Sequence, residues 1–213
     1  MIYIGIDLGA HGGIAWINDR TNLKFNDKIG IMKPALPEIN VIPMPTCQDT
    51  FGDYHWIDEK KIVEIFNEIW RIQHKGNSFF EPCQAVLEDI NFYVNQNMDI
   101  NAVKQLLIQN GFFRGLCVSL GIPYLVVHPN TWQKKMNCQT MRGVHLKNAT
   151  SGMNLEERKA WEKEYNSKSL AIRECKNRFK MVSLIPPGHR VAHNGMADAL
   201  LLAEYGRIHD APY

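Results

Sequence analysis

The chain has 213 residues, of which 45% are apolar and 22% are charged, and its formal net charge is +2. These proportions exclude wholesale disorder and predict a single globular domain over residues 1–213. The sequence has neither a run of about 20 apolar residues that would span a membrane nor the pattern of a secretory signal peptide, so we expect a cytoplasmic protein with no membrane partner.

The first elements read as a β-hairpin. Residues 2–7 form an apolar run that ends in Asp7, a Gly-rich turn follows, and residues 13–17 form a second strand. Residues 40–44 follow as a third strand, which lies at an edge because Pro43 cannot donate to a central ladder. Asp7 therefore stands at the edge of a sheet, where it either binds a cation such as a divalent metal or caps its own turn.

The rest of the chain alternates helices and strands. We expect helices over 58–73, 100–120, 167–179 and 193–208, and strands over 84–88 and 123–127. Asp58 and Ser167 are the expected caps of their helices, and Gly111 and Gly115 are expected to let the second helix pack closely on the strands. This alternation predicts an α/β fold with a mixed sheet and helices on both faces.

The segment 137–166 has weak periodicity and dense charge, so we interpret it as a basic insertion or mobile loop with some helix at 155–165. It lies inside a larger basic region. Residues 128–190 carry thirteen Lys and Arg against five Glu, a net charge of +8, which leaves −6 for the rest of the chain. The region either binds a polyanion such as nucleic acid or forms a solvated helical face.

Three carboxylates lie at the ends of expected elements. Asp7 ends the first strand, Glu88 ends a later strand, and Asp198 is expected in the first turn of the last helix. There the helix dipole alone is sufficient reason for an acid. If the three converge on one edge of the sheet, they repel one another, and one or two Mg²⁺ ions would keep them ionised. Two such ions can activate water and stabilise the leaving oxygen in phosphodiester cleavage.

Several motifs in this order resemble the RuvC family of Holliday-junction resolvases, and its phage-type branch in particular. They are Asp7–Gly9 with Gly12–Ala15, Leu87–Glu88, Asn110–Gly115, Val127–Lys134 and Asn194–Gly206. The resemblance implies an RNase H-like fold, in which a five-stranded mixed sheet has its first three strands antiparallel. It also implies a homodimer that acts in DNA recombination and repair, in the cytoplasm of a bacterium or a phage-infected host cell. The implied activity is that of an endodeoxyribonuclease that cuts four-way (Holliday) DNA junctions with Mg²⁺ or Mn²⁺, with two ions per active site.

By the same resemblance, Asp7, Glu88 and Asp198 are the catalytic residues and the metal ligands. The family usually adds an acid or a histidine about one helical turn before the last Asp, but this chain has Gly195 three residues before it. Asn194 is left as a weak candidate for the fourth ligand, with His193 beyond it. Asn194 is equally a candidate N-cap of the last helix.

Candidate DNA-binding residues fall into two groups. Lys168 resembles a lysine of the family that suits a phosphate, and Lys134 and Lys135 are similar candidates, although each fits a solvated surface too. Phe92 and Tyr93 follow Glu88 at the place where the family tends to carry an aromatic residue. They either stack on a base at an opened junction or pack within their loop.

Two other classes of protein fit part of the pattern. A non-catalytic branched-DNA-binding protein on the same fold would explain why the fourth acid is missing. A sugar-kinase or actin-like ATP-binding protein also opens with a strand, Asp-Leu-Gly and a Gly-rich turn, but the sequence shows neither a second copy of this fold nor a second phosphate loop.

Overall fold

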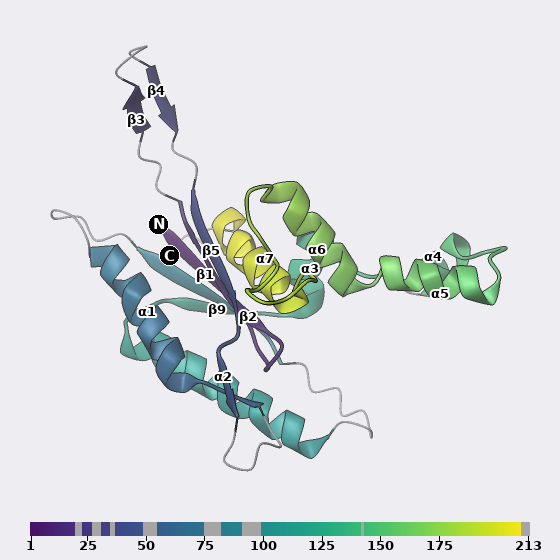
Figure 1. The fold of residues 1–213 in the computed structure, drawn as a ribbon, viewed down its shortest axis with the longest axis horizontal. Helices are drawn as coiled ribbons and strands as arrows, with labels where there is room; N and C mark the ends of the chain where they lie inside the picture. Colours follow the sequence, from purple (N-terminus) through teal and green to yellow (C-terminus); the bar gives the residue numbers. More distant parts are fainter. Residues whose placement is uncertain are drawn as a thin grey trace.

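The computed structural model describes residues 1–19, 23–26, 31–34, 37–48, 55–74, 82–90, 99–141 and 143–209. Its centre is a five-stranded sheet in the order β5-β2-β1-β8-β9, drawn in Figure 1. The strands are β1 (Ile2–Asp7), β2 (Gly13–Asn18), β5 (Glu38–Pro43), β8 (Cys83–Glu88) and β9 (Tyr124–Val127). The five-stranded sheet of an α/β fold is therefore confirmed.

The sheet is mixed. β2 pairs antiparallel with β1 and with β5, whereas β8 pairs parallel with β1 and with β9. The antiparallel β1–β2 pair is a hairpin closed by the Gly-rich turn, whose Gly12 N–H donates to the carbonyl of Gly9 at 2.9 Å. The parallel pairing brings the carboxyl ends of β1 and β8 to the same edge.

One face of the sheet is covered by α1 (Glu59–His74) and α2 (Ile100–Ser119). The buried side chains of this layer include Ile4 of β1, Phe66 of α1 and Phe113 of α2. Asp58 caps α1 as expected, because its Oδ1 accepts a hydrogen bond from the N–H of Lys61 at 3.0 Å.

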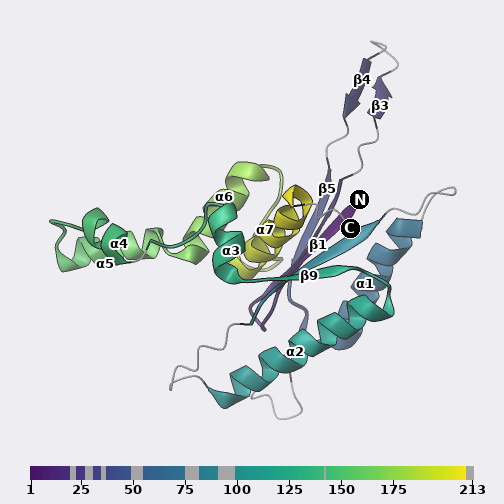
Figure 2. The same cartoon turned by 180° about the vertical axis from the view of Figure 1, so that it is seen from behind.

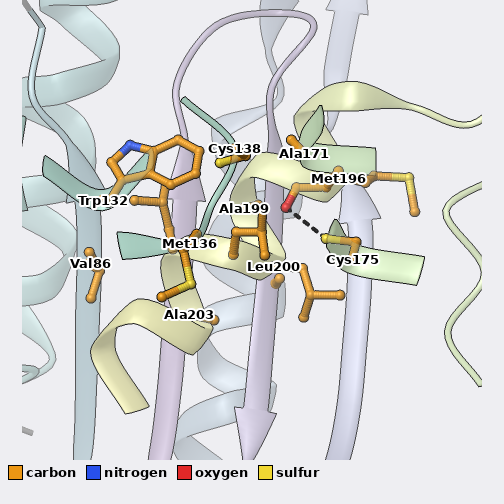
Figure 3. Close-up of a cluster of buried hydrophobic side chains, with 14 of the residues drawn as sticks. Val86, Trp132, Met136, Cys138, Ala171, Cys175, Met196, Ala199, Leu200 and Ala203 are labelled. Carbon is orange, nitrogen blue, oxygen red and sulfur yellow. Dashed lines mark hydrogen bonds between the residues drawn. The ribbon is translucent and has the colours of Figure 1, made fainter. Parts of the chain in front are cut away.

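The opposite face carries α7 (Asn194–Ile208), with α3 (Pro129–Lys135) and α6 (Ser167–Arg178) packed beside it. Figure 3 shows this core, in which Trp132 is fully buried and the Cys175 thiol donates to the carbonyl of Ala197. α7 lies directly on β1 because Gly5 has no side chain: a Cβ there would overlap the carbonyl of Ala199.

Two local expectations are wrong. Asn166 rather than Ser167 caps α6, since its side chain accepts a hydrogen bond from the N–H of Ser169. Gly111 and Gly115 do not face the strands, because a Cβ at either position would meet nothing within 4 Å. The α2 residues that are buried are Gln109, Phe113 and Cys117.

The chain also forms elements outside the main sheet. β3 (Leu23–Asn26) pairs with β4 (Ile31–Pro34), and β6 (Thr46–Gln48) pairs with β7 (His55–Ile57). The segment 137–166 contains α4 (Gly143–Ala149) and α5 (Leu155–Glu164), which extend away from the sheet as an arm (Figures 1 and 2). None of the described helices combines the length and the hydropathy needed to cross a membrane.

Candidate active site

Three carboxylates share one cleft at the carboxyl edge of β1 and β8. The cleft has a volume of about 560 Å³. Asp7 ends β1, Glu88 ends the neighbouring strand β8, and Asp198 comes from α7 on the face above them. The wall of the cleft also includes residues 8–12, Ala102, Gln105, Leu106, Gln109, Gln133, Lys168 and Asn194. The structure thus brings together the three acids that the sequence placed at the ends of separate elements.

Close backbone contact places the start of α7 beside the Gly-rich turn. A Cβ on Gly195 would overlap the carbonyl of His11 and the backbone of Gly12, and a Cβ on Gly13 would lie 2.6 Å from the carbonyl of Gly195. Only glycine at these positions allows the helix to approach so closely. This contact aligns the helix so that Asp198 reaches the cleft.

Asp198 lies later in its helix than expected. It is the fifth residue of α7, and the first turn of that helix contains no acid. The prediction that a first-turn helix dipole accounts for this carboxylate is therefore wrong, since the effect falls off within the first turn.

Burial raises the pKa values of all three acids, and repulsion from neighbouring carboxylates adds to this at Asp7 and Glu88. The pKa of Asp7 lies well above its usual value because the group is buried and because Asp198 and Glu88 repel its charge. Burial, and then Asp198, raise the pKa of Glu88 to about 8. Burial also raises the pKa of Asp198, whereas the positive charge of Lys168 lowers it. The acids form a like-charged cluster, which a bound cation would stabilise.

The donor set fits a hard divalent cation. Carboxylate and amide oxygens are the ligands that Mg²⁺ and Mn²⁺ prefer, and Asp7, Glu88, Asp198 and Asn194 supply them on one wall. Within the described part of the chain, no group of three or more His, Cys, Asp and Glu side chains is arranged to hold a metal ion. The cleft therefore offers the chemistry of a metal site without a preformed cage.

The structure explains why glycine stands at position 195, where a fourth metal ligand was considered. No side chain fits at Gly195, so the position three residues before Asp198 cannot supply a fourth ligand. The N-cap of α7 is His193, whose Nδ1 accepts a hydrogen bond from the N–H of Met196 at 3.2 Å. The N-cap interpretation of Asn194 is therefore wrong, and the role of Asn194 as a ligand stays a prediction.

The candidate DNA-binding residues do not all lie in the cleft. Lys168 lines the cleft, and its charge lowers the pKa values of Asp7 and Asp198. Lys134 and Lys135 are exposed at the end of α3. Phe92 and Tyr93 lie outside the described residues.

The cleft also contains His11, Gln105 and Gln109, to which the sequence alone assigns no functional role. Gln109 is only 2% exposed, and its Oε1 accepts a hydrogen bond from the N–H of Gly9 at 2.7 Å. The spacing of Gln105 and Gln109, four residues apart, places both on one face of the helix, but nothing in the sequence shows that this face meets the cleft.

Comparisons with known proteins gave matches only among solved structures, because no family model and no curated protein matches the chain. RuvC of T. thermophilus in complex with a Holliday junction substrate is 13% identical, with 99% of this chain and 95% of that chain covered and a TM-score of 0.47. A second Thermus thermophilus RuvC structure is 17% identical, with 98% and 96% covered and a TM-score of 0.42. The yeast mitochondrial Holliday junction resolvase Ydc2 is 13% identical, with 94% and 75% covered and a TM-score of 0.36.

Proposed function

We propose that this protein is a structure-selective endodeoxyribonuclease that resolves four-way DNA junctions by metal-dependent phosphodiester hydrolysis. The observation that carries the proposal is the cleft in which Asp7, Glu88 and Asp198, from three separate elements, form one like-charged cluster next to Lys168. Such a cluster is costly in a protein that does not bind a cation there.

The roles of the residues follow from their positions. Asp7, Glu88, Asp198 and Asn194 would hold Mg²⁺ or Mn²⁺, in the proposal two ions per site, and the bound metal lowers the pKa of a water and neutralises developing charge on the phosphate. Lys168 faces the same cleft and orients the DNA backbone as a point charge.

The DNA-binding surface is proposed to include the basic region of the chain. Residues 128–190 carry a net charge of +8, and Lys134, Lys135 and Lys168 belong to it. Affinity should then fall steeply as salt rises, because phosphate contacts release counterions. An affinity that stays flat between low and physiological salt would contradict this surface.

A homodimer is the proposed assembly, and the outer face of α2 is its proposed interface. Ile100, Leu107, Ile108 and Val118 are 66%, 52%, 51% and 69% exposed. Between them lie Gly111 and Gly115, over which there is open space. Small residues four positions apart on a helix face let a second helix approach closely. A two-fold dimer would present two clefts to a four-way junction, which itself has two-fold symmetry.

A non-catalytic branched-DNA-binding protein is the second candidate. It is favoured by Gly195 at the fourth-ligand position and by the absence of a metal-holding group among the described side chains. It differs from the nuclease in that the protein would bind the junction and leave it intact.

The test is cleavage of an end-labelled four-way DNA junction with Mg²⁺ and with EDTA. We expect paired nicks with Mg²⁺, none with EDTA, and none with the Asp7→Asn variant, which should still bind the junction. Asp58→Asn is the matched control, because it makes the same change at a helix cap that does not line the cleft. Binding without nicks by the wild type would support the second candidate, and neither binding nor nicks would defeat both.

A further inference from the structure

The segment 184–193, which joins α6 to the start of α7, forms a closed loop. Its ends are tied by the N–H of His193, which donates to the carbonyl of Leu184 at 2.8 Å. At its tip the N–H of His189 donates to the carbonyl of Pro186 at 3.1 Å, and Gly188 supplies the positive φ of +79° that this turn needs. These bonds hold the loop in one shape before any ligand binds.

The loop presents two aliphatic side chains to solvent. Leu184 is 4% exposed and Pro186 is buried, so both anchor the loop in the core. Ile185 and Val191 are 47% and 75% exposed. A preorganised loop that leaves such side chains without cover can bury them against a partner at little entropic cost.

The charge around these side chains selects the partner. The sequence contains no acidic residue between Glu174 and Asp198, whereas Lys180 and Arg190 lie within that stretch. Arg190 directly precedes Val191 and is exposed. An apolar tip flanked by cations suits a nucleic acid, in which bases and phosphates alternate on the surface.

The loop leads directly into a residue of the cleft wall. Its last residue, His193, precedes the cleft residue Asn194. Burial and the charges of His11 and His189 lower the pKa of His193, and His11 lines the cleft. In Figure 1 the yellow-green chain before α7 runs beside that helix to its first turn.

We propose that the 184–193 loop is a wedge that contacts unstacked bases at the branch point of the DNA, while Arg190 contacts a neighbouring phosphate. The inference rests on the proposed function, which places a branched DNA in the adjacent cleft. Ile185 and Val191 lie against the bases that lose their stacking partners where the strands exchange. The loop thus recognises the branch, which a linear duplex lacks.

The test uses the Asp7→Asn protein in EDTA, so that binding is measured without metal and without cleavage. The probes are a four-way junction with 2-aminopurine at the branch and a linear duplex of the same length. Replacing Ile185 and Val191 by Ser should weaken junction binding about tenfold or more and abolish the rise in 2-aminopurine fluorescence, because burial of one such side chain is worth about a factor of ten. Duplex binding should change less than about twofold.

Three further variants complete the test. Met181→Ser changes an exposed aliphatic residue of the same stretch, 94% exposed but outside the loop, and should leave both affinities unchanged. Val191→Ser alone repeats the test at a side chain too exposed to matter for folding, which circular dichroism checks. Arg190→Gln should weaken binding to both DNAs. It should also reduce the slope of the logarithm of the affinity against the logarithm of the salt concentration by about 1.

The outcomes separate the two proposals. Junction binding and fluorescence that match the Asp7→Asn parent in both Ser variants would overturn the wedge and leave the proposed function standing, as would an equal loss on junction and duplex. An Asp7→Asn parent that does not bind the junction would overturn the proposed function and the wedge with it.

Discussion

The Oε1 of Gln109 accepts a hydrogen bond from the backbone N–H of Gly9 at 2.7 Å, which ties α2 to the turn that follows Asp7. The bond spans 100 residues of sequence and crosses from the helix layer to the edge of the sheet. Gly9 adopts a φ of +108°, a conformation that favours glycine, and the Gln109 side chain pairs its amide in that conformation. Gln109 therefore holds the turn after Asp7 in place.

Replacing Gln109 by Leu should lower the rate of junction nicking while junction affinity stays the same. The buried N–H of Gly9 would lose its acceptor, at a cost of about 1–3 kcal/mol to the free energy of unfolding. Part of that cost is offset because the Nε2 of Gln109 has no partner within the described residues. Urea unfolding and single-turnover nicking measure the two effects, and unchanged values of both would show that the bond has no role.

Stability without metal should fall as the pH rises. Glu88 has a pKa of about 8 in the folded protein against 4.5 in its ordinary state, and the pKa of Asp7 is shifted in the same direction. The folded protein therefore keeps protons that the unfolded chain releases, so the free energy of unfolding decreases between about pH 4.5 and about pH 8. Thermal unfolding in EDTA across this range measures the effect.

Added Mg²⁺ should then stabilise the protein more at about pH 8 than at about pH 5, because it binds the ionised acids. Asp198→Asn removes one of the repelling charges and should stabilise the metal-free protein by about 1 kcal/mol while nicking is lost. A metal-free protein whose stability rises over this range, or an Asp198→Asn protein that is less stable, would contradict the account of the cluster.

Gly195→Ala should displace α7 from the Gly-rich turn. Its Cβ would overlap backbone atoms of His11 and Gly12, which cannot rotate away, so we expect a loss of about 2 kcal/mol or more in the free energy of unfolding. Gly115→Ala is the control, since a Cβ there meets nothing within 4 Å and alanine favours a helix. Equal stabilities of the two variants would mean that the helix does not approach the turn this closely.

The proposed α2 interface predicts the effect of a charge on its outer face. Ile108→Glu should convert the dimer to a monomer, because it would bury a carboxylate against the same face of the second copy. Sedimentation velocity on the wild type and the variant measures this. Lys104→Glu, near the end of the face, is expected to weaken the dimer less. A wild type that sediments as a monomer would overturn the interface.

The spacing of apolar residues, together with the capping and turn residues, was sufficient to predict the sheet and the helices that cover it. The helix at 58–73 was predicted with its Asp58 cap, and the strand at 123–127 was predicted within one residue. That strand lies at the edge of the sheet and is mostly half-buried, because only β8 among the described strands pairs with it. The orientation of α2 was missed, because its apolar residues surround the helix and do not indicate which side packs. Gly111 and Gly115 were assigned to the sheet on their size alone, and size fits an open face equally well.

Only some of the site residues could be predicted from the sequence. The three acids that line the cleft could be predicted because Asp7 and Glu88 each end a strand and because the resemblance added Asp198 to them. The cap His193 was missed because histidine is an uncommon cap, so Asn194 was preferred by type. Gln109 could not be assigned either, because its role depends on a contact with Gly9 that no local pattern encodes.

The most direct test of the central claim is a Mn²⁺ titration followed by electron paramagnetic resonance, because it asks whether the three carboxylates bind a divalent cation together. We expect the wild type to bind Mn²⁺ and Asp7→Asn, Glu88→Gln and Asp198→Asn each to lose that binding, whereas Asp58→Asn retains it. Mn²⁺ binding that survives all three single substitutions, or a folded wild type that binds none, would contradict the claim.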